Sequence, residues 1–96
     1  METLPRKRRF SVHWSLRYRR IDESEWHRGL TVNMSLSGVL FEALEPLSAN
    51  DAVELSILFQ TPGQRAASSV VRTSGYVVRT EPRMPALIAV KFTPVS

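Results

Sequence analysis

Three residues that could shape a binding surface lie in the stretch VNMSLSGVLFEA, residues 32–43: Asn33, Ser35 and Gly38. Each of these residue types weakens the interior of a β-sheet, yet apolar residues flank them on both sides. Asn and Ser side chains can satisfy the backbone groups of a turn, and glycine is common there. The same polar groups can also hydrogen-bond to a docked molecule. The pattern therefore predicts either a plain turn or a turn that something docks against.

A second group of chemically active residues is basic and lies near the N-terminus. Residues 1–20 carry seven Lys or Arg side chains and one acidic side chain, whereas the remaining chain carries six basic and eight acidic ones. The first nine residues, METLPRKRR, have little to bury, so we expect a flexible basic arm over residues 1–9. Such an arm indicates an anionic partner: a nucleotide, a nucleic acid, a membrane surface or an acidic protein patch. The alternative is a solvated tail that aids solubility.

The chain offers little for catalysis or for a metal site. It has no cysteine, and its two histidines, His13 and His27, lack the H-x-x-x-H or H-x-H spacing of metal ligands. No glycine-rich phosphate loop is present, and the carboxylates are scattered through turn-like segments. We therefore expect a binding protein that is not an enzyme and that holds no metal or cofactor.

The elements that must position these residues are strands. Polar and apolar residues alternate in HWSLRYR, as in a half-buried strand. Further strands are expected at 26–34, 38–44, 52–59, 66–81 and 86–92, with a bulge at Gly75 in the long fifth one. No segment shows a capped helix with a period of 3.6 residues. Short strands between turns predict an all-β barrel, because closure removes the exposed edges of so small a sheet.

Length and composition add the broad class. A chain of 96 residues makes one domain with a single modest core. No apolar run approaches the ~18 residues that a membrane span needs, and polar residues interrupt the segment where a signal peptide would have its apolar region. The absence of cysteine fits a reducing compartment. We expect a cytoplasmic protein without a membrane span.

Taken together, the arm and the Asn-Ser-Gly segment resemble the PilZ domain, a bacterial receptor module for the second messenger cyclic di-GMP. That family is marked by R-x-x-x-R followed, a few tens of residues on, by D/N-x-S-x-x-G. The second motif is complete here as NMSLSG, and nineteen residues separate His13 from Asn33. In the first motif Arg9 takes the first Arg position and His13 takes the second. The resemblance extends over nearly the whole chain, to the closing IAVKF.

The resemblance implies a small six-stranded antiparallel β-barrel over residues 10–96. Its C-terminal helix is expected to be absent or minimal, because the chain ends at TPVS. It also implies cyclic di-GMP as the ligand. The planar guanidinium of Arg can donate paired hydrogen bonds to a guanine edge or to a phosphate. Glycine allows positive φ and the close approach of a purine. The ligand-binding residues implied are Arg8, Arg9, His13, Asn33, Ser35 and Gly38.

Two alternatives stay open. A PilZ-like domain that lacks the second Arg could bind no nucleotide and act as a protein-interaction adaptor for a downstream partner. A basic barrel could also bind single-stranded nucleic acid. Nucleic acid is less expected, because the aromatic residues that could stack on bases occupy core-like alternating positions: Trp14, Tyr18, Phe41, Phe59 and Phe92.

Overall fold

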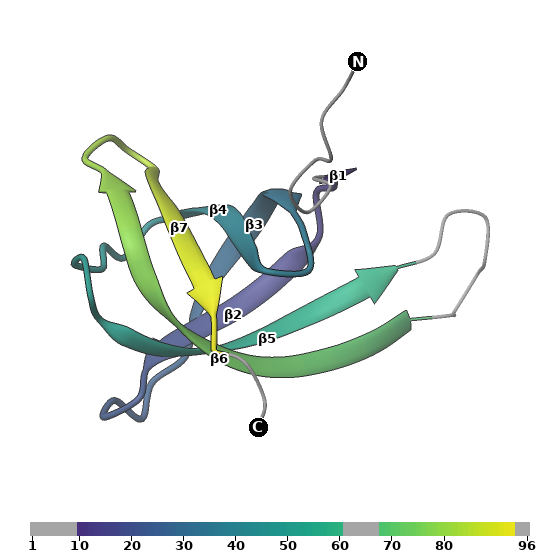
Figure 1. Ribbon diagram of the computed structural model, residues 1–96, viewed down its shortest axis with the longest axis horizontal. Coiled ribbons are helices and arrows are strands. Elements are labelled where there is room, and N and C mark those ends of the chain that lie inside the picture. The colour runs from purple at the N-terminus through teal and green to yellow at the C-terminus, as the bar shows by residue number, and fades with distance from the viewer. Residues whose placement is uncertain (1–9, 61–67, 94–96) are drawn as a thin grey trace, which may run out of the picture.

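Every regular element of the described chain is a β-strand (Figure 1). The computed structural model describes residues 10–60 and 68–93, and these ranges contain no helix, hence none that could cross a membrane. The strands are β1 (Phe10–Ser11), β2 (Ser15–Arg20), β3 (His27–Met34), β4 (Gly38–Ala43), β5 (Ala52–Gln60), β6 (Ser68–Glu81) and β7 (Ala86–Phe92). The all-β class is confirmed. The arm expected over residues 1–9 lies outside the described residues.

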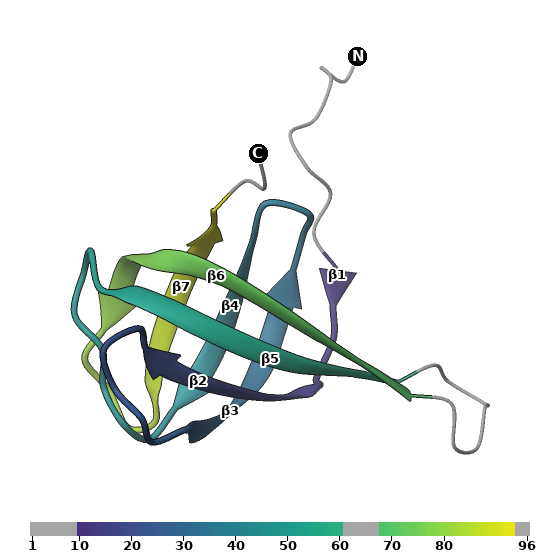
Figure 2. The ribbon, with the colours of Figure 1, turned by 90° about the horizontal axis from the view of Figure 1, so that it is seen from below.

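The strands form one antiparallel sheet that closes on itself. Hydrogen-bonded neighbours follow the order β1-β3-β2-β5-β6-β7-β4, and β4 also pairs with β3. The longer strands, β2 to β7, therefore form the closed six-stranded antiparallel barrel that the sequence predicts. The two-residue β1 adds to one end of β3. Figure 2 shows β2 and β5 crossing in front of β4 and β7, so the barrel has two opposed layers.

Alternation along each strand decides which side chains fill the barrel. In β2, Leu16 and Tyr18 are buried, whereas Arg17 between them is exposed. The rings of Tyr18 and Phe41 pack with their centroids 5.2 Å apart. Burying a large apolar side chain stabilises the fold by about 1.5–3 kcal/mol, and the largest of the other fully buried side chains are Leu55, Ile57, Ile88, Val53 and Val77.

One polar group is built into this core. The Tyr18 hydroxyl donates to the carbonyl oxygen of Glu45 at 2.6 Å and accepts from the Glu45 N–H at 3.2 Å. Burial raises the pKa of Tyr18 to about 12. The neutral phenol therefore links β2 to the segment that follows β4, and both of its hydrogen-bonding roles are satisfied.

The bulge in the long strand β6 lies at a different position from the one predicted. Gly75 pairs regularly with Val53 of β5 and Phe92 of β7, so the bulge expected there is wrong. The register shift lies between Val77 and Arg79 instead. Gly75 has another reason to lack a side chain, since a Cβ would collide with the carbonyl oxygen of Lys91.

Candidate functional site

The Asn-Ser-Gly segment forms a tight turn between β3 and β4. The Ser35 N–H donates to the Gly38 carbonyl oxygen at 2.9 Å, and the Ser37 N–H donates to Ser35 Oγ at 3.2 Å. The two serine hydroxyl oxygens lie 3.1 Å apart. Ser35 is only 7% exposed, so its hydroxyl stabilises the turn from within. Ser37 lies on the side of the turn that lines a surface hollow.

Gly38 serves close strand packing rather than an unusual backbone conformation. Its φ lies outside the left-handed region, so the predicted positive φ is wrong. A Cβ at this position would collide with the carbonyl oxygen of Val90, because β4 and β7 approach closely where Gly38 pairs with Lys91. Gly38 also lines the same hollow as Ser37. The glycine therefore holds the turn against β7 and leaves the hollow open beside it.

A bulge in β3 turns Asn33 toward the outer surface. Thr31 pairs with Phe41 of β4, and both side chains point into the barrel. Regular pairing would place Val32 opposite Leu40 and Asn33 opposite a core position. The register instead shifts between Thr31 and Asn33, so that Asn33 itself pairs with Leu40 on the outer face. Inserting one residue re-aims the side chains that follow it, which is a common use of bulges near binding sites.

A second bulge does the same for Arg79 in β6. Val77 pairs with the core residue Val90, and after the register shift Arg79 pairs with Ala89 on the outer face. Without the shift, Val78 would occupy this outer position and the guanidinium would point into the apolar core. The two consecutive valines before Arg79 break the alternation of the strand. Val70 and Val71 in the same strand are also consecutive but pair regularly with β5, so adjacent valines alone do not mark the bulge.

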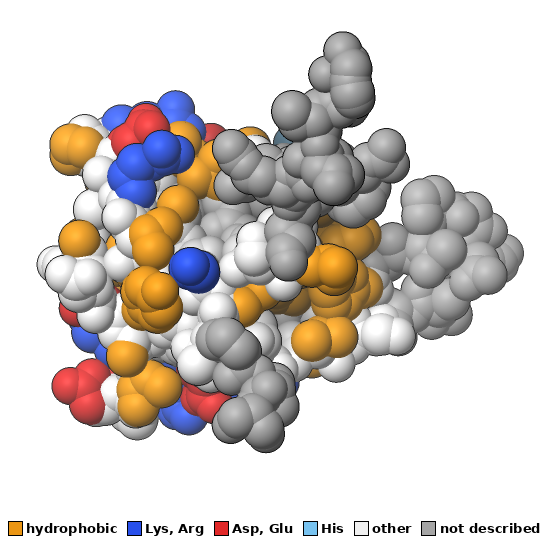
Figure 3. All heavy atoms as spheres, in the orientation of Figure 1, with side chains coloured by type: hydrophobic (Ala, Val, Ile, Leu, Met, Phe, Trp, Pro, Cys, Tyr) orange, Lys and Arg blue, Asp and Glu red, His pale blue; other side chains and the backbone are white. Residues whose placement is uncertain are grey.

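The two bulges create one row of residues across four strands. Asn33 pairs with Leu40, Leu40 with Ala89, and Ala89 with Arg79. A hollow of about 360 Å³ lies over this row, and Lys91 also lines it. Polar groups therefore stand at both ends of a short apolar floor. In the orientation of Figure 1, Figure 3 shows a Lys or Arg side chain near the middle of the molecule with several hydrophobic side chains beside it.

The hollow is electropositive. Among the described residues its lining contains Arg79 and Lys91 but no carboxylate, and neither cation forms an ion pair with the described chain. Both side chains are exposed and can reach an anion. Guanidinium and ammonium groups donate hydrogen bonds to phosphate, and guanidinium also recognises guanine edges. Within the described chain no cluster of His, Asp or Glu could hold a metal ion.

The chain that follows the arm is fixed next to this row. Phe10 pairs with Met34, and Ser11 pairs with Asn33. Thr31, which is fully buried, donates its hydroxyl hydrogen to the Val12 carbonyl oxygen and accepts from the Trp14 N–H at 2.7 Å.

The predicted site residues thus fall into three groups. Asn33 and Gly38 meet at the hollow, and Ser35 supports the turn beside it. His13 is exposed, its Nδ1 lies 3.3 Å from the Thr31 carbonyl oxygen, and it is not among the described residues that line the hollow. Arg8 and Arg9 lie outside the described residues. The residues that sequence reasoning missed are Ser37, Arg79 and Lys91.

Known structures share this fold at low sequence identity. The PilZ domain of YcgR from Escherichia coli, solved with c-di-GMP, is 13% identical, with a TM-score of 0.72 over 98% of this chain and 81% of that one. The inhibitor of motility MotI/DgrA from Bacillus subtilis is 14% identical, with a TM-score of 0.72 over 99% of this chain. The chain spans only 45% of the length of that second structure. No curated protein sequence matches the chain.

The family assignment rests on the sequence itself. The model of the PilZ domain matches residues 5–96, nearly the whole chain, including the arginines of the arm and the NMSLSG turn. PilZ domains are ligand-binding and adaptor domains rather than enzymes. The closed antiparallel barrel has the same fold as two PilZ-type structures. The chain therefore belongs to the PilZ domain family.

Proposed function

We propose that this domain is a non-enzymatic receptor for cyclic di-GMP, and that the ligand binds over the hollow between the β3–β4 turn and Arg79. The observation that carries this proposal is the row of Asn33, Leu40, Ala89 and Arg79 across four strands. Both ends of the row face outward only because of a bulge. Two separate irregularities that aim polar groups at one hollow favour a binding function over a plain turn.

The chemistry of the hollow matches that of the ligand. Leu40 and Ala89 supply a small apolar floor on which the face of a purine can lie. Arg79 can donate two hydrogen bonds to guanine O6 and N7, or grip a phosphate. Lys91 adds a second positive charge for the other phosphate, while Asn33 offers an amide to a base edge. The YcgR domain, which shares the fold, was solved with this ligand.

The arm supplies the remaining contacts in this proposal. Arg8 and Arg9 directly precede Phe10, which pairs with Met34 at the end of β3. A chain that leaves β1 at this point begins next to the β3–β4 turn. The two arginines close over the bound ligand, and the change of arm conformation alters a surface that a downstream partner reads. The domain thereby acts as a signalling module of the bacterial cytoplasm.

His13 supports a second candidate function. It occupies the second Arg position of the family motif, and a neutral imidazole cannot reproduce the two-pronged charged contact of a guanidinium. It is also absent from the described lining of the hollow. A domain with this change that binds no nucleotide would serve as a protein-interaction adaptor.

Calorimetry separates these functions. The protein is titrated with cyclic di-GMP, with GTP and with a short single-stranded oligonucleotide, and then Arg79→Ala is compared with Arg83→Ala. Arg83 is a matched control because it is an exposed arginine that pairs with Glu42 away from the hollow. We expect binding of cyclic di-GMP alone, weakened roughly tenfold to hundredfold by Arg79→Ala, because a bidentate contact to guanine is worth about 1–3 kcal/mol. Equal affinities for the two variants would contradict the proposed site, and no binding of any ligand would favour the adaptor.

A further inference from the structure

The opposite layer of the barrel carries a second basic surface. This surface, which we call the arginine face, consists of the outward side chains of β2 and β5 together with the adjoining parts of β3 around Arg28 and of β6 around Arg72. We propose that the arginine face docks a protein segment that combines acidic and large apolar side chains. The proposal does not depend on nucleotide binding, since the hollow of the candidate site has its floor on β4 and β7, and β2 and β5 cross in the opposite layer (Figure 2).

Three arginines lie in one row across the four strands of this face, with Ser56 between Arg17 and Arg72. Arg28 pairs with Arg17, Arg17 pairs with Ser56, and Ser56 pairs with Arg72. Like charges directly opposite each other destabilise a sheet. Placing Arg17 opposite Arg28 therefore costs stability in the free domain, and a bound anionic group would relieve that repulsion.

Neighbouring arginines show how the same sheet neutralises charge elsewhere. Arg19 donates to Glu54 at 2.8 Å, and Arg20 donates to Asp51 at 3.1 Å. Within the described part of the chain, Arg17 and Arg28 have no such carboxylate partner. The exposed pair is therefore available to carboxylates that come from another molecule.

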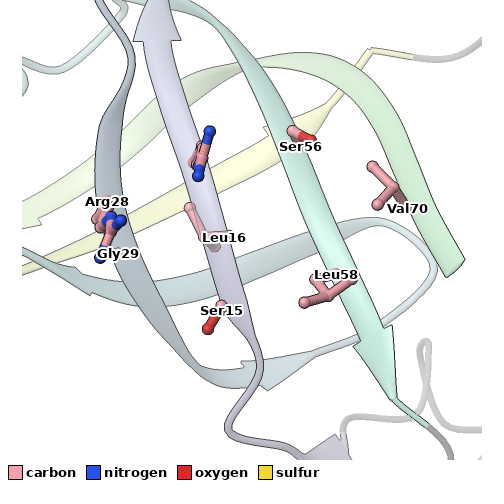
Figure 4. A pocket seen from close by; sticks show the side chains of 8 residues that line it. Ser15, Leu16, Arg28, Gly29, Ser56, Leu58 and Val70 are labelled. Carbon is pink, nitrogen blue, oxygen red and sulfur yellow. The ribbon is translucent and has the colours of Figure 1, made fainter. Parts of the chain in front are cut away.

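A mostly apolar row, interrupted by Ser15, runs beside the arginines. Leu58 of β5 pairs with Val70 of β6, and Leu30 of β3 pairs with Ser15 of β2. Leu30 is 43% exposed and Val70 is 60% exposed. A depression of about 440 Å³ reaches from Arg28 across Ser15 to Val70, and Figure 4 shows these side chains spread over neighbouring strands. A partner with acidic and apolar side chains side by side would match both rows at once.

The aromatic content of the face argues against nucleic acid. Single strands bind to basic surfaces that also offer free aromatic rings for base stacking. Trp26 lies at the edge of the arginine face, but the Arg19 and Arg72 guanidinium carbons lie 4.6 Å and 5.4 Å from its ring centroid. Its ring is therefore already engaged in cation–π contacts. A protein segment needs no such stacking platform.

The test uses a synthetic peptide of alternating glutamate and leucine, with a lysine–leucine peptide of the same length as the control. Each is titrated into isotope-labelled full-length protein, and backbone amide shifts are followed by NMR. We expect the acidic peptide alone to shift amides of β2, β3 and β5 around Arg17 and Arg28. The double variant Arg17→Glu/Arg28→Glu should weaken that binding by about tenfold or more. A variant with the same change of net charge at the hollow of the candidate site, Arg79→Glu/Lys91→Glu, should retain most of the peptide binding.

Several outcomes would overturn the proposal. Equal binding of both peptides, or shifts confined to β4 and β7, would show that the arginine face is not the docking surface. Binding of a short oligonucleotide or of phosphatidylserine vesicles at this face, with no response to the acidic peptide, would assign it to another partner. If the glutamate double variant fails to fold, Arg17→Gln/Arg28→Gln removes the same charges without adding new ones. Unchanged peptide affinity in that folded variant would also refute the proposal.

Discussion

Replacing Thr31 with valine should loosen the segment that joins β1 to β2, because one buried hydroxyl makes two of the hydrogen bonds that hold it. The Thr31 side chain is fully buried, accepts from the Trp14 N–H at 2.7 Å and donates to the Val12 carbonyl oxygen. Valine has nearly the same shape, so the change removes the hydroxyl without leaving a cavity. The backbone hydrogen bond from the Thr31 N–H to the Trp14 carbonyl oxygen, at 2.9 Å, stays in place.

The cost follows from two lost hydrogen bonds. Each is worth about 0.5–1.5 kcal/mol net, so we expect a loss of about 1–3 kcal/mol in the free energy of unfolding. For a domain of 60–100 residues, each kcal/mol lowers the Tm by roughly 4–8 °C. The Trp14 ring, which packs edge-on against Phe59 with centroids 4.6 Å apart, should become more mobile as its backbone loosens.

Thermal unfolding followed by circular dichroism measures the loss of stability, and amide hydrogen exchange measures the loosening of the Trp14 backbone. The Trp14 amide should exchange faster in Thr31→Val, while the Thr31 amide, whose partner remains, serves as the internal reference. Thr73→Val is the matched control, because the Thr73 hydroxyl forms no hydrogen bond with the described residues. An unchanged Tm together with a still-protected Trp14 amide would show that the Thr31 hydroxyl does not hold this segment.

Three further predictions concern the turn, the core and the motif. Gly38→Ala should cost about 1–3 kcal/mol of stability by forcing a Cβ against the Val90 carbonyl oxygen, which denaturant unfolding measures. The pKa of Tyr18 is raised to about 12, above its ordinary 10.0, so the unfolded chain ionises first: stability is full below about pH 10 and falls as the pH rises toward 12. Melting curves from pH 8 to 12 should show this fall in the parent and in the control Tyr76→Phe, but a smaller one in Tyr18→Phe. His13→Arg should tighten cyclic di-GMP binding about tenfold in calorimetry, and an unchanged affinity would place residue 13 outside the ligand contacts.

The barrel could be predicted from the sequence because the alternation of polar and apolar residues that produces its strands is local. Alternation in stretches such as residues 15–20 and 86–92 marks which side chains must be buried, and the strands observed there match the expected ones closely. Closure followed from the cost of exposed edges in a small antiparallel sheet. These arguments need no knowledge of how distant segments pair.

The candidate site was only partly predictable because it depends on pairing between distant strands. The motif singled out Asn33 and Gly38, but the roles of Arg79 and Lys91 follow from the register of β6 against β7 and of β7 against β4. A one-residue shift in that register decides whether Arg79 points outward or into the core. Likewise, the sequence alone suggested that Gly38 has a positive φ. Its close contact with β7 can be recognised only from the pairing of the strands.

The most direct test of the proposed function is a titration of isotope-labelled protein with cyclic di-GMP, followed by NMR at backbone amides. We expect saturable shifts at Asn33, Gly38, Arg79 and Lys91, which come from four strands but line one hollow. The amides of Arg17 and Ser56, on the opposite layer, should stay unchanged. Shifts centred on that opposite layer, or none at a cyclic di-GMP concentration in large excess over the protein, would show that the hollow does not bind the ligand.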